Sequence, residues 1–323
     1  MRIVLIGVSH WHTPFYADPI LEMTDAAIVG VSDPDVARAA DLAARAKCPA
    51  FPDYRDMCGR LKPDFAFALG RHRDMADTAR FLIASRIPFA IEKPCAINAT
   101  EARDIAERAA SAKIFAAVPL VFRYCPIIDT IREVAAGEDI QYLSFKFVGG
   151  MVDRYRQQNV EWVTDRAISG GGPLLNLGIH FVDLCRVLLN NAPLTVTGAM
   201  MSNRAAGLTI EDHAVMLMQG PASCMIETGY LYPAPNSVFD MHYSIRTARH
   251  YFAARDATTL EISDDARARH TREMVLINAP LYPIFVADTL RRLEHGEKPI
   301  AGLDDMVEAM RLVQDAYALS PLE

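Results

Sequence analysis

The sequence lacks the features that would assign it to a membrane or a nucleic acid. No apolar stretch comes near the roughly 20 residues that a membrane-spanning helix needs. Cations are in deficit, with 33 Lys and Arg against 40 Asp and Glu. Because neutralising phosphates requires clustered cations, we expect neither a nucleic acid nor a membrane as a partner.

Cysteine is scarce and scattered. The six cysteines form no Cys-x-x-Cys pair and no zinc-ligand spacing, so we expect reduced, mostly buried thiols. The opening residues MRIVLIGV read as a strand and a turn, without the small-residue cleavage site of a signal peptide. These observations predict a cytoplasmic protein. The alternative to buried structural thiols is a catalytic cysteine, and Cys95 is the best placed of the six for that role.

What is present is the composition of an ordinary folded protein, with 51% hydrophobic and 23% charged residues. The 323 residues exceed the roughly 250–300 at which one hydrophobic core stops growing. We therefore predict two domains, residues 1–120 and residues 121–323.

Strands and helices alternate in the first domain. Short apolar strands are predicted at 2–6, 27–31, 65–69, 89–91 and 114–118, with helices at 17–23, 35–46, 53–61, 73–85 and 100–111. This alternation is typical of an α/β doubly wound parallel sheet.

The pattern changes in the second domain. Two helices, 126–136 and 174–189, are followed by helices 284–295 and 304–318 near the end of the chain. Strand-like runs dominate between them, at 142–148, 195–201, 214–219, 224–230, 239–246, 250–253 and 259–262. No crossover helices separate the runs from residue 195 onward, so we predict an α+β domain with a large, mostly antiparallel open sheet.

The turn after the first strand is typical of a dinucleotide site. Of the usual GxGxxG pattern only Gly7 is present. Asp33 follows His12 by 21 residues, the spacing at which an acid accepts hydrogen bonds from the adenine ribose. An acid there repels a 2′-phosphate and no Arg follows immediately, so NAD is favoured over NADP. Alternatively, Asp33 only caps the helix 35–46.

The same turn contains Ser9, His10, Trp11 and His12. Two histidines at i and i+2, with no carboxylate beside them in the sequence, are a poor metal pair, and we predict no metal. We place these turn residues beside the cofactor phosphates or the nicotinamide.

Glu92-Lys93-Pro94 directly follows the strand 89–91. Ligands of open α/β sheets bind at the carboxyl ends of strands, and a Lys there can donate to a substrate oxygen or titrate if it is desolvated. A solvated surface pair is the alternative.

A glycine-rich segment starts a helix in the second domain. Gly170 to Gly172 precede Pro173, which suits the first helical position. At about 100° per residue, Asn176, His180 and Asp183 lie in one stripe of that helix.

Taken together, EKP after the fourth strand and GGGxLxxxGxHxxD resemble the Gfo/Idh/MocA family of NAD(P)-dependent oxidoreductases. The resemblance extends to Arg123, Trp162, Asp165 and the closing helix 304–318. It implies an N-terminal Rossmann domain, a C-terminal open sheet and oxidation or reduction of a sugar, cyclitol or related carbonyl compound. It also implies that Lys93 and His180 are the catalytic positions and that Asp33 contacts the ribose.

Two departures from the family pattern matter. Asn176 stands where the family usually has Asp, and an amide can hydrogen-bond substrate but cannot relay a proton. The segment 70–74 differs from the usual Thr-Pro-Asn turn. We nevertheless place Gly70, His72 and Glu92, with Lys93, at the cofactor.

For the oxidation of an alcohol, the base is His180 or Lys93, and the ordinary pKa of His favours His180. Lys93 then polarises the oxygen. Selectivity is expected from the polar stretch 153–159, whose two arginines suit an acidic sugar unless it is only a charged surface loop. The predicted substrate contacts are Asn176, Arg123, Asp183, Tyr155, Arg156 and Trp162.

Two other functions stay open. One is a sensor or regulator of the same fold, which would bind dinucleotide and ligand without turnover. The presence of both Lys93 and His180 argues against it, because a sensor needs neither. A third possibility is transient oxidation during elimination or hydrolysis. An open antiparallel sheet usually covers its exposed face with a partner, so we expect a homodimer or homotetramer through the C-terminal sheet.

Overall fold

The computed structural model describes residues 1–234 and 238–322. Its N-terminal part is a six-stranded parallel sheet in the order β3-β2-β1-β4-β5-β6. The strands are β1 (Arg2–Ile6), β2 (Ala27–Ser32), β3 (Ala50–Phe51), β4 (Phe65–Ala68), β5 (Phe89–Ile91) and β6 (Ala116–Ala117). The connecting helices are α1 (Thr13–Glu22), α2 (Val36–Ala46), α3 (Tyr54–Leu61), α4 (His72–Ala84) and α5 (Ala99–Ala112). The predicted doubly wound α/β domain is confirmed.

Local chemistry sets the ends of these helices. Asp35 starts α2, because its carboxylate accepts a hydrogen bond from the backbone N–H of Ala37. Asn98 starts α5 in the same way through Glu101. Helix α1 begins four residues earlier than predicted, because Pro14 lies in the first turn, where a missing N–H has no helical partner to lose.

The C-terminal part contains an eight-stranded sheet in the order β14-β13-β12-β11-β7-β10-β9-β8. The strands are β7 (Ile140–Gly150), β8 (Thr195–Ser202), β9 (His213–Gln219), β10 (Ser223–Tyr232), β11 (Asp240–Thr247), β12 (His250–Ala254), β13 (Thr259–Asp264) and β14 (Arg269–Glu273). All neighbours are antiparallel except β7 and β10, so the sheet is mostly antiparallel, as predicted. The polar edge strand β14 was not predicted, because it has no apolar alternation.

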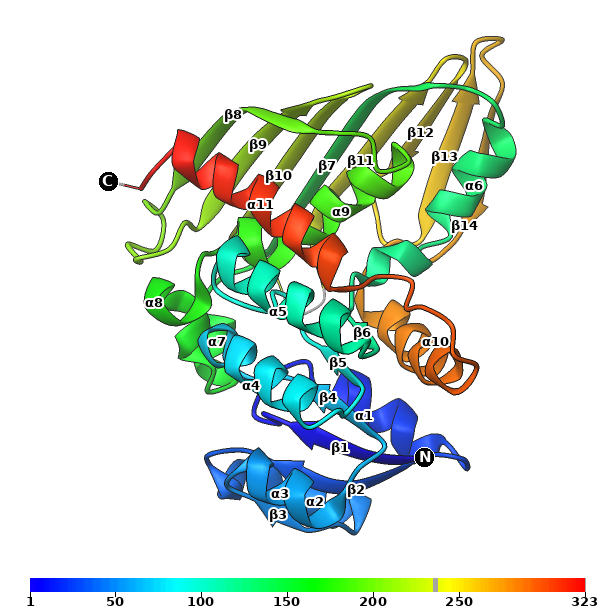
Figure 1. Ribbon diagram of the computed structural model, residues 1–323. Helices are drawn as coiled ribbons and strands as arrows, with labels where there is room; N and C mark the ends of the chain where they lie inside the picture. The colour runs from blue at the N-terminus through cyan, green and yellow to red at the C-terminus, as the bar shows by residue number, and fades with distance from the viewer. Residues whose placement is uncertain (235–237, 323) are drawn as a thin grey trace.

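Helices separate this sheet from the N-terminal domain. The helices of this part are α6 (Ile127–Val134), α7 (Asp153–Gln157), α8 (Arg166–Ser169), α9 (Ile179–Leu188), α10 (Tyr282–Glu294) and α11 (Leu303–Leu319). Figure 1 shows α9 and the red α11 in front of the sheet, with the blue N-terminal domain below them. Helix α11 packs on α5, α9 and β8, and thereby joins the two parts.

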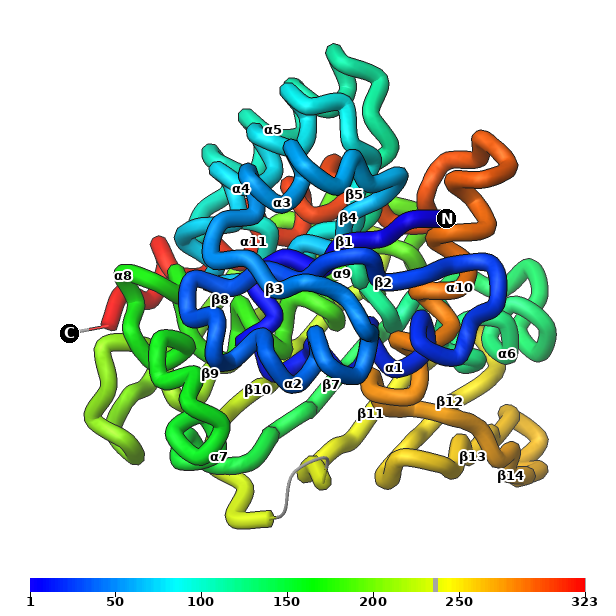
Figure 2. Tube along the Cα trace, turned by 90° about the horizontal axis from the view of Figure 1, so that it is seen from below, coloured from blue at the N-terminus to red at the C-terminus, as the bar shows by residue number. Residues whose placement is uncertain are grey.

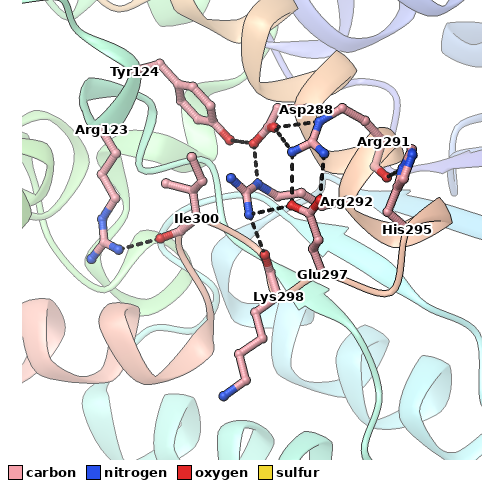
Figure 3. A network of polar contacts seen from close by, with 9 residues as sticks. All are labelled: Arg123, Tyr124, Asp288, Arg291, Arg292, His295, Glu297, Lys298 and Ile300. Atoms are coloured by element: carbon pink, nitrogen blue, oxygen red, sulfur yellow. Dashed lines mark hydrogen bonds and ion pairs between the residues drawn. The ribbon is translucent and has the colours of Figure 1, made fainter.

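The chain returns to the N-terminal domain through α10. This helix packs against α1, and both views place its orange segment beside the blue N-terminal part (Figures 1 and 2). Figure 3 shows how the segment after it is held: Arg292 donates to Asp288 at 2.7 Å and to the carbonyl of Lys298 at 3.1 Å. Tyr124, at the junction between the domains, also donates to Asp288, at 2.8 Å.

Among the described residues, no helix is long and apolar enough to cross a membrane. The last strand of the parallel sheet ends at Ala117, and the first strand of the second sheet begins at Ile140. The domain limit at residue 120 stays a prediction.

Candidate active site

An outer groove of about 640 Å³ runs along the carboxyl ends of β1, β2 and β4. Its wall includes Gly7, Ser9, Asp33, Arg38, Arg55, Gly70, Arg71 and Trp162. Gly7 has a φ of +74°, and a Cβ on it would lie 2.6 Å from the carbonyl oxygen of Leu69. The single glycine retained from the usual pattern is therefore the one that lets the turns after β1 and β4 meet.

Asp33 is buried on the wall of the outer groove. One carboxylate oxygen accepts from the backbone N–H of Ser9 at 2.8 Å and the other from that of Asp35 at 3.0 Å. Asp35, not Asp33, caps α2. Asp33 thus fixes the turn after β1 and still has free lone pairs toward the groove.

Arg38 joins the rim of the outer groove to the second domain, which the sequence did not indicate. Its guanidinium donates to the backbone carbonyls of Ser9 at 3.2 Å, Gln158 at 3.2 Å and Asn159 at 2.8 Å. Because those bonds neutralise no charge, Arg38 keeps a cation at the groove that contains Asp33.

A smaller inner cavity, of about 130 Å³, lies between the two domains. Its wall consists of Trp11, His12, Phe15, Lys93, Arg154, Tyr155, Gln158, Asn176, Leu177, Phe239, Asn278 and Ala279. The ring of Trp11 lies 5.7 Å from the ring of Trp162 on the outer groove. The two hollows are therefore neighbours, separated by a pair of tryptophans.

Lys93 brings an amine to the wall of the inner cavity. It is 2% exposed, and its Nζ donates to the backbone carbonyl and to the side-chain oxygen of Asn176, both at 2.8 Å. Burial lowers the pKa of Lys93 to about 8, and the carboxylate of Glu92 partly opposes this shift. The amine is therefore able to exist in both protonation states near neutral pH.

Asn176 is fixed in one orientation by two phenols. Its amide nitrogen donates to the hydroxyls of Tyr155 at 2.9 Å and Tyr230 at 2.8 Å, which leaves its oxygen toward Lys93. The structure thus brings together three sequence-predicted residues, Lys93, Asn176 and Tyr155. Tyr230 was missed, because one buried Tyr on a strand has no local signal of function.

Glu92 lies behind the inner cavity in a buried hydrogen-bond network. Its Oε1 accepts from Tyr16 at 2.7 Å and lies 2.8 Å from Nδ1 of His12, while Oε2 accepts from the backbone N–H of Lys93 at 2.7 Å. Tyr282 from α10 lies 3.1 Å from the same Nδ1. Burial lowers the pKa of His12, against the opposing effect of Glu92, so its ring is neutral at pH 7.

His10, His12 and Glu92 place one potential ligand atom each within 4.8 Å of one another. The oxygens of Glu92 already accept from Tyr16 and from the backbone of Lys93. The arrangement is that of a hydrogen-bond network in which Glu92 is fixed by donors on both oxygens.

His180 does not reach the wall of either hollow. It is buried, and neither ring nitrogen has a hydrogen-bond partner among the described residues. Burial, and then the charge of Lys93, lowers the pKa of His180 well below its ordinary value. The helix that contains His180 begins with a π-helical turn, Leu174–Gly178. Residues in such a turn are spaced differently around the helix axis, so Asn176 and His180 do not lie in one stripe as predicted.

Arg123 and Asp183 bind each other rather than lining the cavity. Nε and Nη2 of Arg123 donate to the two oxygens of Asp183 at 2.8 and 2.7 Å. Arg123 also contacts Asp305 at 2.7 Å and donates to the carbonyl of Ile300 at 2.6 Å. Figure 3 shows the bond to Ile300 at the junction between the domains.

Of the remaining predicted residues, Trp162 lines the outer groove, whereas His10, His72 and Arg156 lie on the wall of neither hollow. His10 is buried with its ring stacked on Trp11, 3.9 Å between centroids. His72 is buried and its Nδ1 lies 2.8 Å from the carbonyl of Ser169; burial lowers its pKa to about 4. Trp162, predicted at the substrate, lies on the outer groove, and Arg156 is exposed and pairs with its neighbour Asp153.

Comparison with protein families gives two matches. Residues 1–118 match the model described as an oxidoreductase family with an NAD-binding Rossmann fold. Residues 140–249 match the model of the GFO/IDH/MocA C-terminal domain.

Relatives and solved structures agree with these matches. Trans-1,2-dihydrobenzene-1,2-diol dehydrogenase of Sus scrofa is 23% identical over 206 residues, which are 62% of this chain and 59% of that protein. The Mus musculus protein of the same name is 24% identical over 60% of this chain and 57% of its own. The chain thus spans less than two thirds of the length of these relatives.

Two similar structures cover nearly the whole chain. An oxidoreductase from Agrobacterium radiobacter in complex with NAD⁺, L-tartaric acid and magnesium has a TM-score of 0.85 at 17% identity, over 98% of this chain and 95% of that one. Levoglucosan dehydrogenase, in complex with NADH and levoglucosan, has a TM-score of 0.85 at 14% identity, over 99% and 98%. At these identities the likeness shows the fold.

Proposed function

Because this chain belongs to the Gfo/Idh/MocA family of oxidoreductases, we propose that it transfers hydride between NAD and a secondary alcohol or carbonyl of a sugar, cyclitol or sugar-acid-like compound. The observation that carries the proposal is Lys93. Its buried amine lies on the wall of the inner cavity, and that cavity adjoins the outer groove. Oxidation of an alcohol requires a group that takes up the hydroxyl proton, and a titratable amine beside a dinucleotide groove is such a group.

The residues of the outer groove fit NAD. The groove follows the carboxyl ends of the parallel strands, where dinucleotides bind in this type of sheet, and Gly7 keeps the turn free of a Cβ. We propose that the carboxylate of Asp33, on the wall of the groove, accepts from ribose hydroxyls and repels a 2′-phosphate. Ser9 and Gly70 complete the wall. NAD, when bound, supplies the acceptor or donor of the hydride.

Lys93 is the proton carrier that we favour. As an ammonium it donates to the substrate oxygen, and as an amine it accepts the hydroxyl proton. Asn176 aims the amine through its oxygen but takes no proton itself. His180 remains the second proposed catalytic position. Its ring is buried away from the cavity wall and makes no hydrogen bond to the described residues, so substitution has to test this role.

The test is a panel of sugars, polyols and sugar acids with NAD, followed by absorbance of the reduced nicotinamide. We expect at least one substrate to be oxidised. A Lys93→Met variant is expected to lose about 10²-fold or more of turnover, the usual size of an acid–base contribution, while keeping its affinity for NAD. Ligand binding without turnover in the parent protein would instead favour the sensor.

We also propose that the chain forms a homodimer or homotetramer through the outer face of the eight-stranded sheet. That face carries exposed apolar side chains on three strands, namely Met200 on β8, Leu217 on β9 and Tyr251 on β12. Met200 and Leu217 lie on neighbouring strands, and a contiguous apolar patch on a sheet face favours burial against a partner. Sedimentation of the parent and of Leu217→Glu tests this, and a parent protein that is monomeric at micromolar concentration contradicts it.

A further inference from the structure

Arg154 is a cation on the wall of the inner cavity without an acidic partner. It lies on α7, just after β7, and is half-buried. Its Nη2 donates to the hydroxyl of Tyr155 at 2.8 Å, whereas its buried Nε has no hydrogen-bond partner among the described residues. None of the described carboxylates lies within ion-pair distance of it. Arg156 on the same helix, in contrast, is exposed and pairs with Asp153.

Two tyrosine rings and two glycines lie next to this guanidinium. It lies over the rings of Tyr155, at 4.7 Å, and Tyr230, at 5.3 Å. β7 ends in two glycines close to the guanidinium: a Cβ on Gly149 would lie 3.2 and 3.3 Å from Nη1 and Nη2, and one on Gly150 would lie 3.5 Å from Nη1. A side chain at Gly149 would therefore crowd the guanidinium, whereas a Cβ on Gly150 would be in ordinary van der Waals contact with it.

The wall of the inner cavity has an excess of positive charge. Its wall contains two cationic side chains, Lys93 and Arg154, and none of its twelve residues is an acid. The buried carboxylate of Glu92 lies behind Lys93 and acts on that amine, but it forms no ion pair with Arg154 among the described residues. A partly desolvated guanidinium without a counter-charge is costly unless a ligand supplies that charge.

We propose that Arg154 binds a carboxylate of the substrate, so that the preferred substrates are polyhydroxy acids rather than neutral sugars or polyols. The planar guanidinium matches a carboxylate with two parallel hydrogen bonds, and Nη1 makes no hydrogen bond to the described residues. Lys93, on the wall of the same cavity, then meets a hydroxyl of the same molecule. The reaction at that hydroxyl rests on the proposed function; the binding of the carboxylate does not.

Matched pairs of compounds test this assignment. With NAD present, binding is measured by thermal shift and titration calorimetry for glucuronate against glucose and for gluconate against sorbitol, with glucose 6-phosphate as a third arm. We expect each acid to bind at least about 10-fold tighter than its neutral partner. Arg154→Gln is expected to weaken the acids by about 10- to 100-fold, the range of hydrogen bonds to charged groups, and to leave the neutral compounds unchanged.

Three further variants separate the causes. Arg154→Lys keeps the charge but not the planar fork, so we expect it to recover only part of the affinity. Gly149→Ala leaves Arg154 in place but displaces its guanidinium, so it is expected to weaken the acids selectively. Arg132→Gln, an exposed cation on α6, is the control and is expected to change nothing.

Equal affinity of the parent for acids and neutral compounds overturns the assignment. So does an Arg154→Gln variant that weakens both classes alike, because that outcome indicates a packing role against the tyrosines. Tighter binding of the phosphate than of either carboxylate also overturns it. Arg154-dependent binding of acids without formation of NADH contradicts the proposed dehydrogenase and leaves this inference standing.

Discussion

The substitution Asp183→Asn tests whether the ion pair with Arg123 is part of the scaffold. The two side chains are 2% and 10% exposed and share two hydrogen bonds of 2.7 and 2.8 Å. Removing one partner of a buried ion pair costs about 3–5 kcal/mol. Because Asp305 still contacts the guanidinium at 2.7 Å and Asn keeps one acceptor, we expect a loss of about 2–3 kcal/mol in the free energy of unfolding.

Urea unfolding followed by circular dichroism measures this loss. The control is Asp129→Asn, in which the acid is 89% exposed and 3.7 Å from Arg132, so its removal should cost less than about 0.5 kcal/mol. Affinity for NAD and turnover are expected to stay close to those of the parent at temperatures where Asp183→Asn is folded. A variant that keeps its stability but loses affinity for substrate would refute the reasoning and restore the contact predicted from the sequence.

Four other predictions follow from the site. The kcat/KM for oxidation should rise with pH through a midpoint near 8, because burial lowers the pKa of Lys93 to about 8 and only the neutral amine accepts a proton. A Lys93→Arg variant should lose this rise in its pH–rate profile. In binding titrations the parent should prefer NAD to NADP, and Asp33→Ser should narrow or reverse that preference; equal affinities in the parent contradict the ribose contact. His180→Ala should lower turnover by about 10²-fold with unchanged NAD affinity in steady-state assays, and a small effect would show that the buried ring is only structural. Gly172→Ala should destabilise the protein by about 1–3 kcal/mol in thermal unfolding, because its Cβ would lie 2.1 Å from the carbonyl oxygen of Glu211.

The positions of residues that depend on local chain geometry were predictable. Lys93 follows a buried strand, and the carboxyl end of such a strand faces the ligand side of the sheet whatever the rest of the chain does. Gly7 and Asp33 follow the same rule, and the structure places both on the outer groove. The alternation of strands and helices was sufficient for the fold of the N-terminal domain.

Residues whose role depends on distant partners were not predictable. Asp183 lies on the same helix as Asn176, yet it pairs with Arg123, 60 positions earlier in the chain. The π-helical turn changes the angle between Asn176 and His180, and no residue type encodes such a turn reliably. Arg154 and Arg156 look alike in sequence, but only the tertiary structure puts one on the cavity wall and the other in solvent.

The return of helix α10 makes the two domains poor candidates for recombination. Tyr282, at its start, lies against His12 in the turn after β1, and Asn278, just before it, is part of the cavity wall. An N-terminal domain transplanted onto the second domain of another family member would therefore meet a foreign surface at this helix. A working chimera therefore has to receive two separate segments from the same parent, residues 1–118 and residues 278–300.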